Sequence, residues 1–199
     1  AIRNHVRNKF YTVINVGGLA IGIASCLIIM LFVKHELGYD TFNENAERIY
    51  RVNTELRFGA VQKRLAEAAA QLNDLFAQNY GEIESTVRLW DWGPRYVRRP
   101  DQSERFQEKA AWSDSTLFMV FTIPLLEGDA RSALTEPNTV AISRTMAEKY
   151  FPEGNAVGKS LILDDDVNNR VTAVFEDLPS NSHFHFDMFR SIVGLPQAK

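Results

Sequence analysis

The stretch FYTVINVGGLAIGIASCLIIMLFV, residues 10–33, decides what kind of protein this is, because it runs for 24 consecutive residues without a charge. As a helix rising ~1.5 Å per residue it would be about 36 Å long, more than the ~30 Å hydrocarbon layer of a bilayer. Thirteen of its residues are Leu, Ile, Val or Phe, which together favour insertion by roughly 4 to 8 kcal/mol. The sequence therefore predicts a transmembrane helix over residues 10–37.

The charges on either side of this stretch predict its orientation. Arg3, Arg7 and Lys9 precede it, whereas Lys34 and His35 are followed at once by acidic residues. Positive residues stay on the cytoplasmic side, so residues 1–9 form a cytoplasmic flank and residues 38–199 lie outside the cytoplasm. Residues 34–199 carry 19 basic and 25 acidic side chains, and this acidic balance argues against strong attraction to anionic headgroups.

Small and polar residues recur along one side of the predicted helix. Asn15, Gly18, Gly22 and Ser25 are spaced three, four and three residues apart, so they share a helix face on which another helix can approach closely. Such spacing also arises by chance in membrane helices. We nevertheless expect a helix-packing face, because Asn15 on the same stripe is costly toward lipid.

Cys26 is the one cysteine, which excludes a disulfide scaffold. Ile23-Ala24-Ser25-Cys26 resembles the lipobox of bacterial lipoproteins, and a cleaved signal is an alternative to a permanent span. The apolar run continues for seven residues after Cys26, where a mature lipoprotein usually turns polar, so a membrane-buried thiol is favoured over lipidation.

The remainder of the chain alternates helical and extended patterns and predicts an α+β domain with a mixed sheet and packed helices. The expected helices cover residues 41–48, 62–79, 114–121 and 143–150. The expected strands cover residues 49–58, 105–113, 139–142 and 183–189, together with two hairpins, 84–92 with 95–99 and 160–163 with 170–175.

Three segments resemble ligand sites without matching them. Residues 154–160 lack one residue of a phosphate-binding loop and precede a strand instead of a helix. Asp164, Asp166 and Asn168 mimic calcium ligands, but the loop lacks the glycine and the final glutamate of such sites. His183, His185 and Asp187 would share one strand face, yet a fourth zinc ligand is missing. The sequence therefore predicts no metal, no cofactor and no catalytic constellation.

Aromatic and basic side chains interleave in the first predicted hairpin and form a possible partner surface: Trp90, Trp92, Arg95, Tyr96, Arg98 and Arg99. One interpretation is contact with an acidic periplasmic protein, lipid headgroups or a transported ligand. The other is an exposed hairpin whose arginine stems cover aromatic surface. The predicted location excludes nucleic acid as the partner.

Several motifs at both ends of the chain resemble those of MacB/FtsX-like ABC transporter permeases. The start of such permeases resembles residues 1–4, 7–9, 14–15, 18–22, 36–42 and 48–52. The MacB-like periplasmic core domain resembles residues 142–143, 147–151, 157–160, 177–184 and 186–187. The middle, about residues 59–134, is only loosely similar.

This resemblance implies a permease whose first transmembrane helix leads into a periplasmic domain and which works as a dimer. A cytoplasmic ABC ATPase subunit would hydrolyse ATP, so this chain itself would not be an enzyme, and membrane lipid would surround the span. The domain would be incomplete at Lys199, and an ATPase domain upstream stays open, as do homo- or heterodimerisation and the transported substrate. The alternative is a singly anchored periplasmic binding or sensor module.

Overall fold

The computed structural model describes residues 9–59, 61–164 and 167–195, and divides the chain into two compact units, residues 1–40 and 41–199. Most of the predicted cytoplasmic flank, residues 1–8, lies outside the described residues. The predicted domain boundaries at residues 9 and 37 stay predictions.

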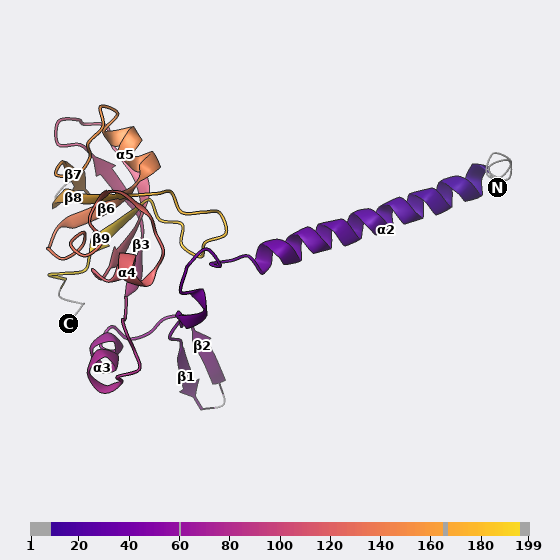
Figure 1. Ribbon diagram of the computed structural model, residues 1–199, viewed down its shortest axis with the longest axis horizontal. Helices are drawn as coiled ribbons and strands as arrows, with labels where there is room; N and C mark the ends of the chain where they lie inside the picture. The colour runs from indigo at the N-terminus through magenta and orange to yellow at the C-terminus, as the bar shows by residue number, and fades with distance from the viewer. Residues whose placement is uncertain (1–8, 60, 165–166, 196–199) are drawn as a thin grey trace. The chain divides into compact units, whose positions relative to one another are not determined.

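The first unit is one helix, α2 (Lys9–Glu36), which runs without interruption through Gly17, Gly18 and Gly22 (Figure 1). Residues 10–36 of it are long and apolar enough to cross a membrane. Lys34 and His35 occupy its last turn, where positive charge complements the partial negative charge of the helix carboxyl end. The helix continues ten residues beyond Cys26, in agreement with the predicted continuous apolar run.

The second unit is built on seven strands that form one mixed sheet. The strands of this sheet are β3 (Leu89–Arg98), β4 (Phe106–Ser113), β5 (Leu125–Gly128), β6 (Thr139–Ser143), β7 (Ser160–Leu163), β8 (Val167–Phe175) and β9 (Met188–Ser191). β4 pairs with β9 in parallel, as does β6 with β8, and the other pairings are antiparallel. The predicted α+β class with a mixed sheet is confirmed.

Six of these strands close into a ring, which we call the barrel. The order β8-β6-β9-β4-β3-β7 returns to its start because β7 pairs with both β3 and β8. The β3–β7 seam is short, since it joins only Val97 to Leu163 and Arg98 to Ile162. β5 lies outside the ring, paired with the second half of β8.

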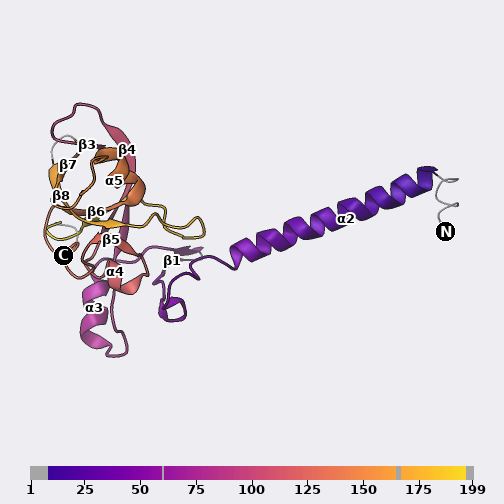
Figure 2. The same cartoon turned by 45° about the horizontal axis from the view of Figure 1, so that its top comes forward.

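Alternating residues of the strands form two separate cores. The inner core takes at least one residue from each barrel strand, for example Val97, Ala110 and Val140, together with side chains of α5 (Arg144–Tyr150). The outer core gathers the alternate residues, such as Ala111 and Phe189, against α4 (Leu117–Val120). Figures 1 and 2 show α5 and α4 at separate places along the sheet.

Several predicted elements are confirmed by the structure. The expected strands 105–113 and 139–142, the helix 114–121 and the hairpin 160–163 with 170–175 correspond to β4, β6, α4 and β7–β8. The helix 143–150 corresponds to α5, whose cap Ser143 accepts a hydrogen bond from the Met146 backbone N–H at 3.2 Å. β5 had no counterpart among the expected strands.

The predicted helix over residues 62–79 is wrong in its first half. Residues Val61–Leu65 form β2, which pairs with β1 (Thr54–Phe58) as an antiparallel hairpin, and only Leu72–Asn79 forms helix, α3. Gly59 adopts a φ of +58° at the hairpin turn, a left-handed conformation that glycine accepts readily. Local pairing with β1 therefore overrides the helical spacing of the apolar residues.

The predicted hairpin with a turn at Gly93-Pro94 is also wrong, because β3 passes through both residues as one strand. The register against β4 shifts between Asp91 and Gly93, which marks a β-bulge at Trp92. Gly93 adopts a φ of +73°, and its N–H donates to Asp91 Oδ1 at 2.8 Å. A bulge uses the same glycine chemistry as a tight turn, which explains the error.

Two further predictions need correction. The expected helix 41–48 is reduced to the short 3-10 helix η1 (Ala46–Arg48), and the expected strand 49–58 begins only at Thr54. The expected strand 183–189 begins only at Met188, so His183, His185 and Asp187 lie in the loop before β9 and do not share a strand face.

Candidate interaction sites

The stripe on α2 lies on one side of the helix. At ~100° per residue, Asn15, Gly18, Gly22 and Ser25 fall within about 80° of the helix circumference. Side chains of this helix are exposed along its length. A Cβ placed on Gly18 or Gly22 would meet no atom within 4 Å. This face therefore has the room that a second helix needs for close backbone approach, and its role stays a prediction.

Two hydrogen bonds hold the first residues of the barrel domain in place, and we call them the Asn43–Thr122 clasp. The Thr122 N–H donates to Asn43 Oδ1 and the Glu44 N–H donates to Thr122 Oγ1, each at 2.9 Å. Asn43 is only 6% exposed, so its amide holds the chain firmly against the segment between α4 and β5. Sequence reasoning missed this contact, because the two residues are 79 positions apart.

Residue Trp92, at the bulge of β3, belongs to the inside of the domain. Its ring lies 4.5 Å from that of Trp112, and the Arg95 guanidinium lies 4.5 Å above its face. Arg95 also donates to the Trp92 carbonyl and lies 3.4 Å from the Asp164 carboxylate. Trp92 and Arg95 are thus committed to internal contacts, as the alternative of arginine stems covering aromatic surface expects.

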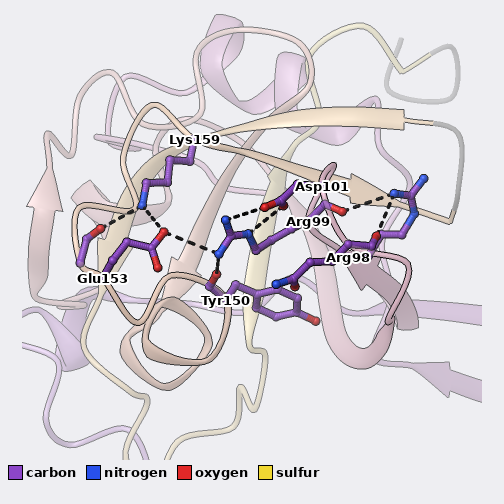
Figure 3. A network of polar contacts seen from close by, with 8 residues as sticks. Arg98, Arg99, Asp101, Tyr150, Glu153 and Lys159 are labelled. Carbon is purple, nitrogen blue, oxygen red and sulfur yellow. Dashed lines mark hydrogen bonds and ion pairs between the residues drawn. The ribbon is translucent and has the colours of Figure 1, made fainter.

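The structure places Arg98 and Arg99 in an intramolecular polar network (Figure 3). Arg99 contacts the carboxylates of Asp101 and Glu153 at 2.9 and 3.6 Å, and donates to the Tyr150 carbonyl at 3.1 Å. Arg98 donates to backbone carbonyls, those of Arg99 and Gln102. Arg99 therefore fastens the loop after β3 to the end of α5, whereas Arg98 bonds within that loop.

Two members of the predicted partner surface stay accessible. Trp90 is 48% exposed and Tyr96 is 46% exposed. Tyr96 lies under the guanidinium of Arg105, 4.9 Å from the ring centre. The structure therefore separates the six residues into an exposed aromatic pair and four side chains with internal contacts.

Arg190 of β9 is a buried arginine that the sequence did not single out. Its guanidinium lies 4.3 Å from the Trp112 ring and 5.3 Å from the Trp92 ring, and it donates to Asn138 Oδ1 at 2.7 Å. The side chain is 6% exposed, and burial lowers its pKa to about 10, which leaves it charged at neutral pH. A regular spacing of charged residues does not reveal such a position, since its neighbours come from separate strands.

A second charged group lies inside the domain where α5 meets β4. Glu108 accepts hydrogen bonds from the Tyr150 hydroxyl at 2.8 Å and from Lys149 Nζ at 2.7 Å. Burial raises the pKa of Tyr150 far above its ordinary value, and the hydrogen bond to Glu108 adds to this effect. The phenol therefore stays protonated and joins α5 to the barrel.

Residues of two look-alike ligand sites make internal contacts. Lys159 donates to Glu153 Oε1 at 2.8 Å and to the Gly154 carbonyl at 3.0 Å. The hydrogen bond from Lys159 lowers the pKa of the Glu153 carboxyl. Asp164 pairs with Arg95, whereas Asp166 lies outside the described residues. Within the part of the chain that the structure describes, no group of three His, Cys, Asp or Glu is placed to hold a metal.

One polar depression of about 300 Å³ opens where β4, the β6–α5 junction and the segment between β8 and β9 meet. Asp177 accepts from the N–H and hydroxyl of Thr145 at 3.0 and 2.7 Å, and Asp187 accepts from the Lys109 N–H at 2.8 Å. Its lining residues are Lys109, Ser143, Thr145, Asp177, Leu178, His185, Phe186 and Asp187. These groups offer charges of both signs to a small polar ligand.

Comparison with known proteins identifies the family. The family model of the MacB-like periplasmic core domain matches residues 12–198, and this chain belongs to that family. The predicted resemblance to MacB/FtsX-like permeases is therefore confirmed. No protein with curated annotation matches the chain.

Three solved structures are similar to this chain, and the first of them shares its fold. A domain of a protein described as a permease, from Porphyromonas gingivalis, is 24% identical with a TM-score of 0.60, over 67% of this chain and 61% of that one. The periplasmic region of MacB from Actinobacillus actinomycetemcomitans is 18% identical, with a TM-score of 0.46 over 60% of this chain and 52% of that one. The extracellular domain of the ABC-type transporter YknZ from Gram-positive bacteria is 17% identical, with a TM-score of 0.46 over 61% and 60%. The chain thus spans less than two thirds of each of these structures.

Proposed function

We propose that this chain is the amino-terminal part of an ABC transporter permease of the MacB/FtsX-like type, with α2 crossing the inner membrane and the barrel domain in the periplasm. The observation that carries the proposal is the family match over residues 12–198. That match runs from inside the apolar helix to the end of the described barrel domain, so the two belong to one family unit.

In this proposal a cytoplasmic ATPase subunit supplies the energy and a second permease copy completes the transporter. The exposed stripe on α2 supports such packing, because glycines at positions 18 and 22 allow a neighbouring helix to approach and Asn15 can hydrogen-bond across the contact. Coupling requires two arrangements of that packing with different free energies. The permease then does mechanical work for export or efflux while the ATPase subunit performs the hydrolysis.

The Asn43–Thr122 clasp supports transmission beyond the membrane. A displacement of the chain after α2 reaches residues 43 and 44 first, and these are hydrogen-bonded to Thr122. Next to Thr122, Phe121 packs edge to face on Phe184 at 5.0 Å, in the loop before β9. That loop lines the polar depression, so movement at the clasp has a contiguous set of contacts along which to act.

The test uses the full protein with its co-purified ATPase in nanodiscs. Gly18→Leu and Gly22→Leu should leave membrane insertion intact but lower ATP-coupled activity, since a leucine side chain blocks close helix approach. Gly17→Leu is the matched control, because residue 17 faces about 120° away from the stripe and a Cβ there also meets nothing within 4 Å. Equal activity in all three variants would remove the coupling role of this face.

The alternative, an anchored binding or sensor module, is favoured by the polar depression of about 300 Å³. Replacing α2 by an unrelated apolar helix separates the two functions, because a tether survives the exchange and a force-transmitting helix does not. Mass spectrometry of the endogenous protein in mild detergent adds a second criterion. A co-purifying ATPase supports the permease, and its absence supports the module.

A further inference from the structure

The segment between the clasp and β3 has regular structure without a core of its own. Among the described residues from 44 to 96, none is buried. The β1–β2 hairpin pairs only within itself. An isolated two-stranded hairpin is marginally stable in water, so these strands gain when another surface covers them.

The hairpin has one apolar face that ends in an apolar tip. Cross-strand partners point to the same side of a hairpin, so Phe58, Val61, Leu56 and Lys63 share one face. Phe58 is 70% exposed and Val61 66% exposed, on either side of the turn. The opposite face carries the polar pairs Glu55 with Arg64 and Arg57 with Gln62.

The net charge of the stretch that contains the hairpin is opposite in sign to that of the whole chain. Residues 49–66 contain four basic residues and one acidic residue, a net charge of +3, whereas the whole chain has a net charge of −3. The ion pair between Arg57 and Glu55 is long, at 3.4 Å, and well solvated, and Lys63 and Arg64 are exposed. The acidic average that argued against contact with headgroups conceals this basic element.

We propose that the β1–β2 hairpin docks on the anionic lipid headgroups of the membrane that α2 crosses, with Phe58 and Val61 entering the interface. Exposed aromatic and aliphatic tips flanked by basic residues fit the boundary between headgroups and acyl chains, where apolar burial and attraction to anionic lipid act together. Only 17 residues separate Glu36 from Thr54, and such a short tether raises the effective concentration of the hairpin at the surface. This inference rests on the proposed membrane span of α2.

The experiment places a polarity-sensitive fluorophore on the tip of the full chain in nanodiscs, one copy per disc. In a Cys26→Ser background, Val61→Cys carries the label on the apolar face, and Gln62→Cys carries it on the opposite face as the matched control. The discs contain either zwitterionic lipid alone or zwitterionic with anionic lipid, and a headgroup-attached quencher reports proximity. We expect blue-shifted, quenched emission at position 61 in anionic discs and water-like emission at position 62.

The second arm of the experiment removes positive charge from the hairpin. Lys63→Gln together with Arg64→Gln should lower the docking equilibrium constant roughly 25-fold, since each basic side chain near an anionic surface contributes about five-fold. Raising the ionic strength should weaken docking of the unaltered hairpin in the same direction.

Three outcomes would overturn the inference. Water-like emission at position 61 in anionic discs excludes headgroup docking. Emission at position 61 that is the same in zwitterionic and anionic discs also excludes it. A blue shift that appears only with two copies per disc assigns the face to a second copy instead. A label on native Cys26 reports the span separately, so that failure of the hairpin to dock is distinguished from failure of α2 to cross.

Discussion

Removing the Tyr150 hydroxyl tests whether its hydrogen bond to Glu108, between α5 and β4, stabilises the domain. Tyr150 is 3% exposed, and its hydroxyl donates to Glu108 Oε1 at 2.8 Å. A hydrogen bond to a charged group contributes ~1.5–3 kcal/mol net. Tyr150→Phe keeps the ring, so no large cavity adds to the loss. For a chain of this size the expected fall in Tm is roughly 3–12 °C.

The pH dependence of this loss gives a sharper criterion. Because the folded state raises the pKa of Tyr150 above its ordinary value, the native phenol keeps its proton when the unfolded one loses it. The free energy of unfolding therefore falls as pH rises above ~10, with a limiting slope of about 1.4 kcal/mol per pH unit. Phenylalanine has no hydroxyl to ionise, so its stability does not fall in this way. The difference in the free energy of unfolding between the wild type and the variant should therefore narrow between pH 10 and 11.

Thermal and urea unfolding of the chain in detergent, followed by circular dichroism, measures both quantities. Tyr96→Phe serves as the control, because Tyr96 is half exposed and surface substitutions stay within about 0.5 kcal/mol. The reasoning is refuted if Tyr150→Phe shifts Tm by less than 1 °C, or if the difference between the two proteins is the same at pH 8 and pH 11.

Five other substitutions probe four separate contacts. Gly128→Ala should lower the free energy of unfolding by at least about 2 kcal/mol, since φ is +95° and a Cβ would lie 2.5 Å from the Thr172 carbonyl oxygen; an unchanged urea midpoint would contradict this. Trp92→Ala should lower the free energy of unfolding by about 2–3 kcal/mol, and Trp90→Ala should lower it by under 1 kcal/mol. Equal losses would mean that the two tryptophans do not differ in packing on either side of the bulge. Arg88→Lys should cost about 1–2 kcal/mol in thermal melts, because it loses the paired bonds to Asp114 at 2.7 and 2.9 Å. Asn43→Ala should raise amide exchange at Thr122, whose N–H loses its acceptor; unaltered protection there would disprove the clasp.

The sequence predicts those parts of the fold in which the local pattern and the tertiary environment agree. α2 follows from an uninterrupted apolar run, and α5 follows from Ser143 as its cap and Pro152 after its end. The apolar spacing of residues 62–79 is compatible with a helix, but the pairing of β2 with β1 decides its first half. At Gly93-Pro94 the residues of a turn serve a bulge, which only the position of β4 reveals.

The candidate sites could be predicted only where they lie within one element. The stripe from Asn15 to Ser25 needs nothing beyond the helical repeat. Arg190 receives its environment from Trp92, Trp112 and Asn138, on three other parts of the chain. The interleaved arginines of β3 were expected at a surface, yet Arg99 bonds to groups about 50 residues away. Contacts of this kind depend on strand order, which no local pattern contains.

The closure of the barrel limits how another polypeptide can bind it. Strand addition requires a row of unpaired backbone N–H and C=O groups along a sheet edge. Each of the six barrel strands has a neighbour on both sides over at least part of its length. Because β3 pairs with β7 only at Val97 and Arg98, free edges among the described strands are left on the first part of β3, on β5 and on the β1–β2 hairpin. A peptide partner can therefore add a strand to the ring only along the first part of β3. Elsewhere on the ring it must be recognised through side chains and loops, and there changes in specificity can proceed by surface substitution without disturbing the backbone pairing.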